Sequence, residues 1–187
     1  TTSLSSALDN TDAVFIAVGT PSRRGDGHAD LTFVYDVVRE VSSKIRDYAV
    51  IVTKSTVPVG TGDEIEKIIE ETNSSIKCDV VSNPEFLREG SAIDDFMRPD
   101  RVVIGTNSEK AREIMRQIYR PLFLLETPIL FTDRNTAELI KYAGNTFLAT
   151  KITFINEIAN LCEATDINIE DISIGMGSDA RIGSRFL

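Results

Sequence analysis

Short apolar segments alternate with longer amphipathic segments along this chain, and the alternation continues to about residue 131. Residues 13–18 (Ala-Val-Phe-Ile-Ala-Val) form a continuous apolar run, whereas residues 31–45 place apolar side chains at the spacing of one helix face. Strands that are apolar throughout are typical of a parallel sheet covered by helices on both faces, because a strand with one solvated face alternates instead. The sequence therefore predicts an α/β fold with a doubly wound parallel sheet.

Helix-capping residues mark where several of the expected elements begin. Thr61 and Glu64 fit a capping box, and Ser108 and Asn168 are the expected N-caps of two later helices. We expect the further strands and helices of the sheet region at residues 49–53, 61–69, 79–82, 101–105 and 108–119.

From residue 137 to residue 164 the chain contains no proline and a single glycine, and we expect one helix of about 40 Å there. A helix that is apolar on two sides must be covered on two sides, either between domains or in a dimer interface. We therefore divide the chain into residues 1–131 and a helical, dimerising region at residues 132–187. The two apolar stripes consist of Leu148, Ile152, Ile155, Ala159 and Cys162, and of Phe147, Phe154, Ile158 and Leu161.

Charge and composition exclude several functional classes. Lys and Arg together number 20 against 29 Asp and Glu, and the net charge of −9 argues against a nucleic-acid binder. A small phosphate-bearing molecule is still allowed, because backbone amides can bind it. The two cysteines, Cys78 and Cys162, and the single histidine, His28, form no metal-binding cluster, so we expect no metal site.

No apolar run approaches the length of about 20 residues that a membrane span needs. The first residues lack both an initiating Met and the basic-then-apolar pattern of a signal peptide. We therefore expect a cytoplasmic protein without a membrane partner, and a fragment is compatible with this N-terminus.

Three of the expected strands run into turns of small hydroxyl- or amide-bearing residues with a proline, at residues 19–21, 54–58 and 82–85. In an open α/β sheet, ligands bind at the carboxyl ends of the strands, so these three turns are expected to line one crevice. The alternative is that Thr-Pro and Asn-Pro are simply good turn formers, but three such turns after buried strands favour the crevice.

Residues 83–90 (Asn-Pro-Glu-Phe-Leu-Arg-Glu-Gly) are the segment densest in chemical groups. Glu85 and Glu89 would share a face if the segment were helical, whereas an extended loop would leave backbone amides free for a ligand. A carboxylate in a crevice can act as a general base when burial raises its pKa. The alternative, which the segment alone favours slightly, is an exposed, Glu-rich helix start.

Lys141 and Asn145 lie on the apolar stripe of the long helix, two steps and one step back from Leu148. A buried ammonium is costly unless it meets a partner or a ligand, so this pair indicates a functional site. The alternative is that the helix begins outside the core and both side chains are solvated.

Six segments, in this order, resemble the UDP-glucose/GDP-mannose dehydrogenase family and together span nearly the whole chain. The motif that ends at Leu187 is most similar to the branch that acts on UDP-glucose. The segments are Val18-Gly-Thr-Pro21, Lys54-Ser-Thr-Val-Pro-Val-Gly60, Asn83-Pro-Glu-Phe-Leu-Arg-Glu-Gly90, Pro99-Asp-Arg-Val-Val-Ile-Gly105, Glu138-Leu-Ile-Lys-Tyr-Ala143 and Arg181-Ile-Gly-Ser-Arg-Phe-Leu187.

The resemblance implies a Rossmann-like NAD-binding domain, of which residues 1–131 would be the C-terminal part. It also implies an enzyme that uses NAD to oxidise the C6 alcohol of UDP-glucose to a carboxylate in two successive hydride transfers. The product would be UDP-glucuronate, a polysaccharide precursor. The intermediate aldehyde would be captured by a cysteine thiolate, and water would hydrolyse the resulting thioester.

Roles for individual residues follow from the same resemblance. Thr56 would position a water, Glu85 would act as the base that activates it, and Lys141 with Asn145 would hold the C6 oxygen of the sugar. Arg181 would reach the substrate of a neighbouring subunit, which implies a homodimer through the helix at residues 137–164. The remaining contacts would be Thr20, Pro21, Thr56 and Glu89 to NAD, and Glu85, Phe86, Leu87 and Arg88 to the UDP-sugar.

Two motifs of the family are not found among these residues: the Gly-rich turn that receives the NAD pyrophosphate and the Gly-Gly-Ser-Cys motif of the nucleophile. Neither Cys78 nor Cys162 matches the second motif. We therefore expect the middle of a dehydrogenase that is inactive by itself. The alternatives are a sister enzyme acting on GDP-mannose or a UDP-N-acetyl-hexosamine, and a non-catalytic dimerising fragment.

Overall fold

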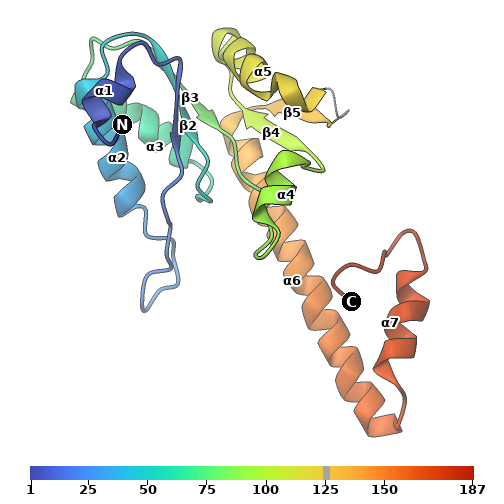
Figure 1. The fold of residues 1–187 in the computed structure, drawn as a ribbon. Helices are drawn as coiled ribbons and strands as arrows, with labels where there is room; N and C mark the ends of the chain where they lie inside the picture. The colour runs from blue at the N-terminus through green and yellow to red at the C-terminus, as the bar shows by residue number, and fades with distance from the viewer. Residues whose placement is uncertain (124–126) are drawn as a thin grey trace. The chain divides into compact units, whose positions relative to one another are not determined.

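The computed structural model describes residues 1–123 and 127–187, which separate into two compact units, Thr1–Lys141 and Tyr142–Leu187 (Figure 1). The first unit contains the sheet, and the second contains most of the long helix. The elements of the first unit are α1 (Leu4–Leu8), β1 (Ala13–Ile16), α2 (Thr32–Lys44), β2 (Ala49–Thr53), α3 (Thr61–Thr72), β3 (Cys78–Ser82), α4 (Ala92–Met97), β4 (Val102–Gly105), α5 (Glu109–Phe123) and β5 (Ile129–Thr132).

The sheet of the first unit has the strand order β1-β2-β3-β4-β5. Strands β1, β2 and β3 are parallel to one another, and β4 is parallel to β5. The predicted parallel sheet is thus correct except at one step, because β3 and β4 are antiparallel and pair at Ser82 and Gly105. A parallel neighbour is usually reached through a helix that packs on the sheet, whereas α4, the helix between β3 and β4, has no buried residue.

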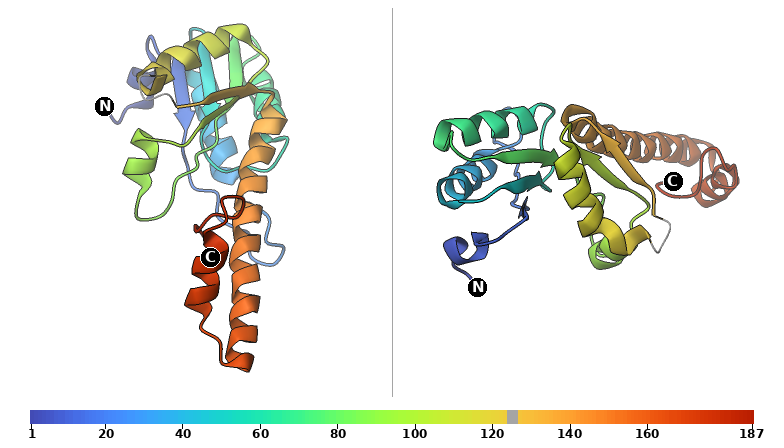
Figure 2. Two further views of the ribbon diagram at one scale, coloured as in Figure 1. Left: turned by 90° about the vertical axis from the view of Figure 1, so that its right-hand side faces the viewer. Right: turned by 90° about the horizontal axis from the view of Figure 1, so that it is seen from above.

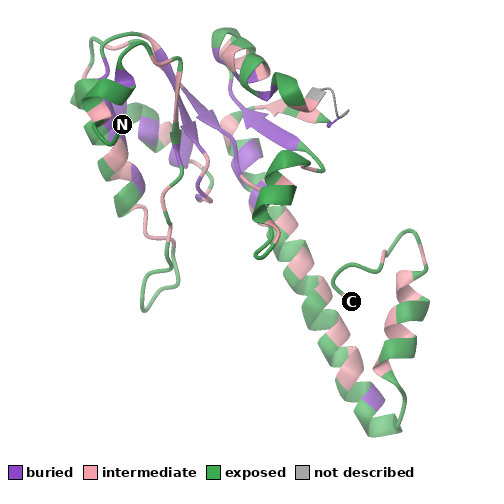
Figure 3. Cartoon of the chain, in the orientation of Figure 1, coloured by how far each residue is buried: buried purple, intermediate pink, exposed green. Residues whose placement is uncertain are grey.

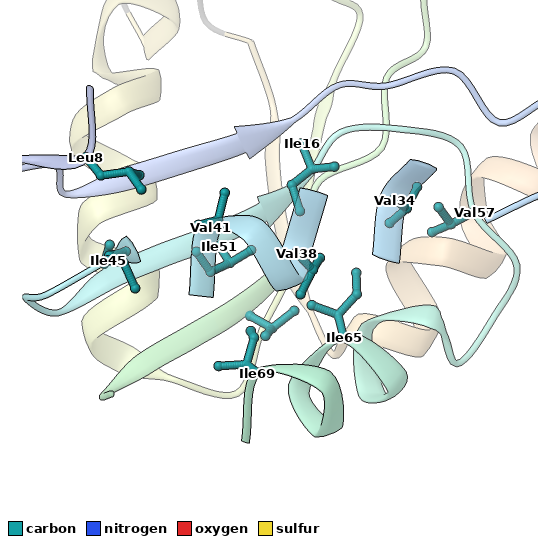
Figure 4. Packing of buried hydrophobic residues seen from close by; sticks show 12 residues of the cluster. Leu8, Ile16, Val34, Val38, Val41, Ile45, Ile51, Val57, Ile65 and Ile69 are labelled. Carbon is teal, nitrogen blue, oxygen red and sulfur yellow. The ribbon is translucent and has the colours of Figure 1, made fainter. Parts of the chain in front are cut away.

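Helices cover both faces of the sheet, as the apolar strands predict (Figures 2 and 3). All five residues of β2 are buried, and its alternate side chains point to opposite faces. Ile51 packs with Val38 of α2 and Ile65 of α3, as Figure 4 shows, while Val50 packs with Met115 of α5. Burying each such side chain stabilises the fold by about 1.5–3 kcal/mol, so the packed core holds the ends of the strands in fixed positions.

The predicted capping box at the start of α3 is wrong. The N-cap is Gly60, whose φ of 92° lies in the left-handed region, and the helix has begun by Thr61. The Thr61 hydroxyl donates instead to the Pro58 carbonyl at 2.6 Å. The other two caps are confirmed, because Ser108 accepts from the Ala111 amide and Asn168 accepts from the Glu170 amide.

The second unit contains α6 (Arg134–Thr165), whose first residues belong to the first unit, and α7 (Ile169–Gly177). The long helix is thus slightly longer than predicted. Cys162 is buried, but Phe147, Phe154 and Leu161 keep 64%, 47% and 59% of their surface exposed. Among the described residues, none of the helices is both long and apolar enough to cross a membrane.

Candidate functional site

The three turns singled out in the sequence are joined to one another by hydrogen bonds. The Ser55 hydroxyl donates to the Val18 carbonyl at 2.6 Å, and the Thr20 hydroxyl donates to the Thr56 carbonyl at 2.9 Å. The third turn joins them where the Asn83 amide donates to the Thr53 carbonyl at 2.9 Å. The carboxyl ends of β1, β2 and β3 therefore form one continuous edge, as the sequence predicts.

Lys141 meets Glu85 at this edge. The Lys141 ammonium donates to Glu85 Oε1 at 2.9 Å, and the Thr56 hydroxyl donates to the same oxygen at 3.4 Å. Lys141 is only 5% exposed, so the expectation of a buried ammonium with a partner is confirmed for this residue. Residues 83–88 contain no helix, and the Leu87 amide is free to donate to Glu85 Oε2.

The electrostatic state of Glu85 differs from the sequence expectation. Partial burial alone would raise the pKa of this carboxyl, but the hydrogen bonds from Lys141 and Leu87 and the charge of Lys141 outweigh it. The pKa of Glu85 is therefore lower than its usual value, not raised. Glu85 is an ionised carboxylate at neutral pH, which can accept a proton.

The rest of the loop at residues 83–90 points its groups in different directions. Two cations lie near the Phe86 ring, with the Arg101 guanidinium 3.9 Å and the Lys141 ammonium 5.4 Å from its centroid. Arg88 is turned to Asp95, with its Nη2 2.6 Å from Oδ1 and its Nε 3.0 Å from Oδ2. Leu87 and Glu89 are exposed.

A second polar cluster, which the sequence analysis did not identify, lies behind the second and third turns. Lys54 Nζ is 3.3 Å from both Asn83 Oδ1 and the Tyr119 hydroxyl, and the Tyr119 hydroxyl also donates to Asn83. The pKa of Lys54 is lowered to about 8, mainly by burial, with the charge of Glu85 opposing the shift and that of Lys141 adding to it. The sequence did contain one indication that Lys54 is partly buried. Lys54 directly follows a buried strand, so the first carbons of its side chain lie at the edge of the sheet.

Glu138 is a buried carboxylate without a predicted role, although it stands three residues before Lys141 on the same helix. It is 2% exposed and accepts from the amides of Gly60 at 2.7 Å and Gly62 at 2.9 Å. It also accepts from the Ser82 hydroxyl at 2.9 Å. Burial raises the pKa of Glu138 despite these bonds. Glu138 thus ties the start of α6 to α3 and β3 and fixes the helix turn that carries Lys141.

Asn145 and Arg181 belong to the second unit. Asn145 is exposed, which corrects the expectation that it lies on a buried stripe. The reason is that many apolar residues of α6 in this unit are themselves exposed. Arg181 forms an exposed ion pair with Asp179, whose Oδ1 lies 3.0 Å from the arginine Nε. Of the predicted residues, the first unit therefore joins Thr20, Thr56, Glu85 and Lys141 through direct contacts.

Both parts of the chain match domains of one known protein family. Residues 1–123 match the NAD binding domain of the UDP-glucose/GDP-mannose dehydrogenase family, and residues 135–187 match the central domain of the same family. The chain belongs to the UDP-glucose/GDP-mannose dehydrogenase family.

Individual members of the family are similar to the chain over its whole length. UDP-glucose 6-dehydrogenase of Rhizobium meliloti (strain 1021) is 61% identical, and the match covers 100% of this chain and 43% of that protein. The structure of a UDP-glucose dehydrogenase from Pyrobaculum islandicum is 41% identical with a TM-score of 0.93, covering 100% of this chain and 43% of that one. The chain thus spans less than half the length of these relatives.

A member with a different substrate in its name is also similar. The GDP-mannose dehydrogenase from Pseudomonas aeruginosa, solved as a ternary complex, is 34% identical with a TM-score of 0.89. The match covers 96% of this chain and 42% of that one. The shared fold therefore does not by itself select the sugar.

A groove beside the end of β1 has a lining that could hold part of a cofactor. Val18, Gly19 and Pro21 line it from the turn, and Phe33 and Val37 line it from α2, with the carboxylates of Asp36 and Glu40 also present. The apolar walls suit a flat ring, and the two carboxylates suit hydroxyl donors but repel phosphate. No atom lies within 4 Å of the place where a Cβ on Gly19 would be, so the backbone is open to a ligand there.

Neither cysteine of this chain resembles an activated nucleophile. Burial raises the pKa of the Cys78 thiol to about 11, with smaller contributions from Asp79 and Glu66. Cys162 is buried on α6. Among the described residues, no group of three or more His, Cys, Asp or Glu side chains could hold a metal ion.

Proposed function

We propose that the whole protein is a UDP-glucose 6-dehydrogenase, which oxidises UDP-glucose to UDP-glucuronate with NAD. The observation that carries this proposal is the buried Lys141 paired with the ionised Glu85 at the carboxyl ends of the strands. The choice of sugar rests on the relative of 61% identity that bears this name.

Lys141 is proposed to hold the C6 oxygen of the sugar. An ammonium has three N–H donors, and Glu85 accepts one of them, so two are available for a ligand. A fixed cation beside an oxygen that gains negative charge lowers the reaction barrier, and one donor of this type commonly contributes about 3–4 kcal/mol. Asn145, four residues further along α6, is proposed to share this role.

Glu85 and Thr56 are proposed to hold the water that hydrolyses the intermediate. Their oxygens are 3.4 Å apart, which allows one water to contact both. The Glu85 carboxylate is ionised at neutral pH and can accept a proton from that water, although its lowered pKa makes it a weaker base than an ordinary glutamate. Phe86, Leu87, Arg88 and Arg181 are proposed to bind the UDP-sugar.

NAD is proposed to lie along Thr20, Pro21, Thr56 and Glu89, beside the groove next to β1. When bound, NAD accepts a hydride from the sugar carbon, and this removes two electrons at each of the two oxidations. The conversion of the CH₂OH group to a carboxylate then consumes one water and two NAD and releases two NADH and three protons.

The protein is further proposed to form a homodimer through residues 137–164 of α6. The exposed Phe147, Phe154 and Leu161 lie at steps of seven residues on this helix and form one apolar stripe. Exposed apolar patches of this kind mark interaction surfaces, and a helix stripe with a seven-residue repeat suits packing against another helix. The cytoplasmic location stays a prediction.

The test is the NADH yield of the whole purified protein with limiting UDP-glucose and excess NAD. We expect two NADH per UDP-glucose, because the alcohol is oxidised twice. GDP-mannose and UDP-N-acetyl-glucosamine are assayed in parallel. Turnover of GDP-mannose alone would refute the proposed substrate, and the absence of NADH with every sugar would favour the non-catalytic alternative.

A further inference from the structure

One lysine of α6 holds the loop that carries Arg181. The Lys151 ammonium donates to three backbone carbonyls of this loop, at 3.0 Å to Ile182, 3.4 Å to Gly183 and 2.7 Å to Arg185. All four residues belong to the second unit. The contact joins positions 31 to 34 residues apart in the chain, so it is a tertiary link and not a local turn.

All three N–H groups of the Lys151 ammonium have an acceptor in this loop. An ammonium has three N–H donors, which equals the number of carbonyls that it contacts here. Three carbonyl oxygens that converge on one point repel each other unless a cation lies between them. Lys151 supplies that cation, so the path of the loop depends on the charge and not only on the hydrogen bonds.

The loop is also shaped from within, around Asp179. The Asp179 carbonyl accepts from the amides of Ile182 and Gly183, both at 2.9 Å, and its carboxylate accepts from the Arg181 amide at 2.9 Å. Gly183 has a φ of +72°, which glycine adopts readily and other residues rarely. These local bonds set the turn, but only Lys151 among the contacts described above ties it to α6.

We propose that Lys151 is a positioning residue for substrate binding, which fixes the loop at residues 181–185 so that Arg181 is presented in one orientation. This inference rests on the proposed role of Arg181 in binding the UDP-sugar. A charged hydrogen bond that a displaced arginine no longer makes to its ligand accounts for about a tenfold or larger loss of affinity. Loss of Lys151 therefore weakens binding of the UDP-sugar and leaves binding of NAD unchanged.

The test compares Lys151→Met with the unmodified protein, in the whole chain. We expect the KM for UDP-glucose to rise about tenfold or more, as for one lost charged hydrogen bond, while the KM for NAD stays the same. Lys151→Arg keeps the charge but has a planar fork that cannot match all three carbonyls, so it restores the KM in part. Lys67→Met is the control, because Lys67 is an exposed lysine of α3 that pairs with nearby Glu64.

Limited trypsin digestion gives a readout that needs no substrate. We expect cleavage after Arg181 or Arg185 to become about tenfold faster in Lys151→Met, because the loop opens more often. Lys151→Gln, a neutral polar variant, is measured beside it, with circular dichroism to establish that each variant is folded. Unchanged cleavage and an unchanged KM for UDP-glucose in both neutral variants would overturn the proposal.

The two proposals can fail separately. If the unmodified protein forms no NADH from UDP-glucose, the proposed function fails, and the digestion still tests the clamp. If trypsin cleaves the loop faster in the neutral variants but the KM for UDP-glucose stays unchanged, Lys151 fixes the loop without positioning Arg181 for the substrate, and the inference is overturned.

Discussion

Lys54 is a partly buried ammonium whose ionisation should be visible in the pH dependence of stability. Its pKa is about 8 in the folded chain, mainly because of burial, against 10.5 for an ordinary lysine. Below pH 8 the folded chain carries the full cost of the buried charge. Between pH 8 and about pH 10 the unfolded chain binds more protons than the folded chain, so the contribution of Lys54 to stability rises with pH.

The measurement is the free energy of unfolding in urea at pH 7 and at about pH 9.5, for the unmodified chain and for Lys54→Met. The difference between the two proteins isolates Lys54 from Cys78, whose raised pKa acts in the opposite direction. Relative to the variant, the unmodified chain should gain up to about 2 kcal/mol, at about 1.4 kcal/mol per pKa unit. A constant difference would contradict the lowered pKa.

Thr53 carries a hydroxyl that is buried without a hydrogen-bond partner among the described residues. It is 1% exposed and lines a small cavity next to Ser82 and Lys141. Thr53→Val removes the hydroxyl at nearly constant volume and should therefore stabilise the chain, by about 1 kcal/mol. Urea unfolding measures this change.

The matched control for Thr53→Val is Thr61→Val. The Thr61 hydroxyl is also buried but donates to the Pro58 carbonyl, so its removal should cost about 1 kcal/mol. If Thr53→Val instead destabilises the chain as much as the control does, the Thr53 hydroxyl has a partner in solution, such as a water in the cavity.

At the scale of elements, the close approach of β4 and α6 depends on Gly105. A Cβ at this position would lie 2.6 Å from the Ala137 Cβ and 2.7 Å from the Asp133 carbonyl oxygen. One of these atoms is backbone and the other a short side chain, so neither can move away cheaply. Gly105→Ala should lower the free energy of unfolding by about 1–3 kcal/mol, measured in urea.

Gly175→Ala is the control at a helical glycine. No atom lies within 4 Å of the place where a Cβ on Gly175 would be, and alanine favours a helix such as α7 over glycine by about 0.5–1 kcal/mol. This variant should be as stable as the unmodified chain or more stable. Equal losses in both variants would mean that Gly105 does not set the distance between β4 and α6.

The elements were largely predictable from the sequence because the strands are apolar throughout. Two features were not. The antiparallel step between β3 and β4 goes with a connecting helix, α4, that has no buried residue, and the polar loop before α4 has no periodicity to show this. The true cap of α3 is Gly60, whose positive φ is set by the turn and not by a side-chain signal.

Helix spacing correctly predicted the burial of Lys141 but not that of Asn145, which is exposed, and it could not show contacts distant in sequence. Lys141 was identified because it interrupts an apolar stripe. Lys54 and Glu138 were not, since their partners Tyr119 and Gly60 lie 65 and 78 residues away. The lowered pKa of Glu85 likewise depends on Lys141, which lies 56 residues away.

At the scale of the whole molecule, the proposed homodimer predicts that a charge on the exposed stripe of α6 separates the subunits. Phe154→Glu places a carboxylate among apolar side chains, which is costly when a partner covers them. We expect the mass in solution, measured by light scattering after gel filtration, to fall from that of a dimer to that of a monomer.

Asn160→Glu is the control for this variant, because Asn160 is exposed on α6 but lies on neither apolar stripe. It should leave the dimer intact. A dimer that survives Phe154→Glu would show that the stripe is not the interface.

The measurement that tests the account most directly is the kcat of the whole protein with Lys141→Ala, using UDP-glucose and NAD. Lys141 contacts the partly exposed Glu85, so its removal should leave the chain folded. If Lys141 holds the reacting oxygen, kcat falls by about a hundredfold to a thousandfold while the KM for NAD is unchanged, and Lys67→Ala has no such effect. An unchanged kcat in a folded Lys141→Ala protein would contradict the central claim.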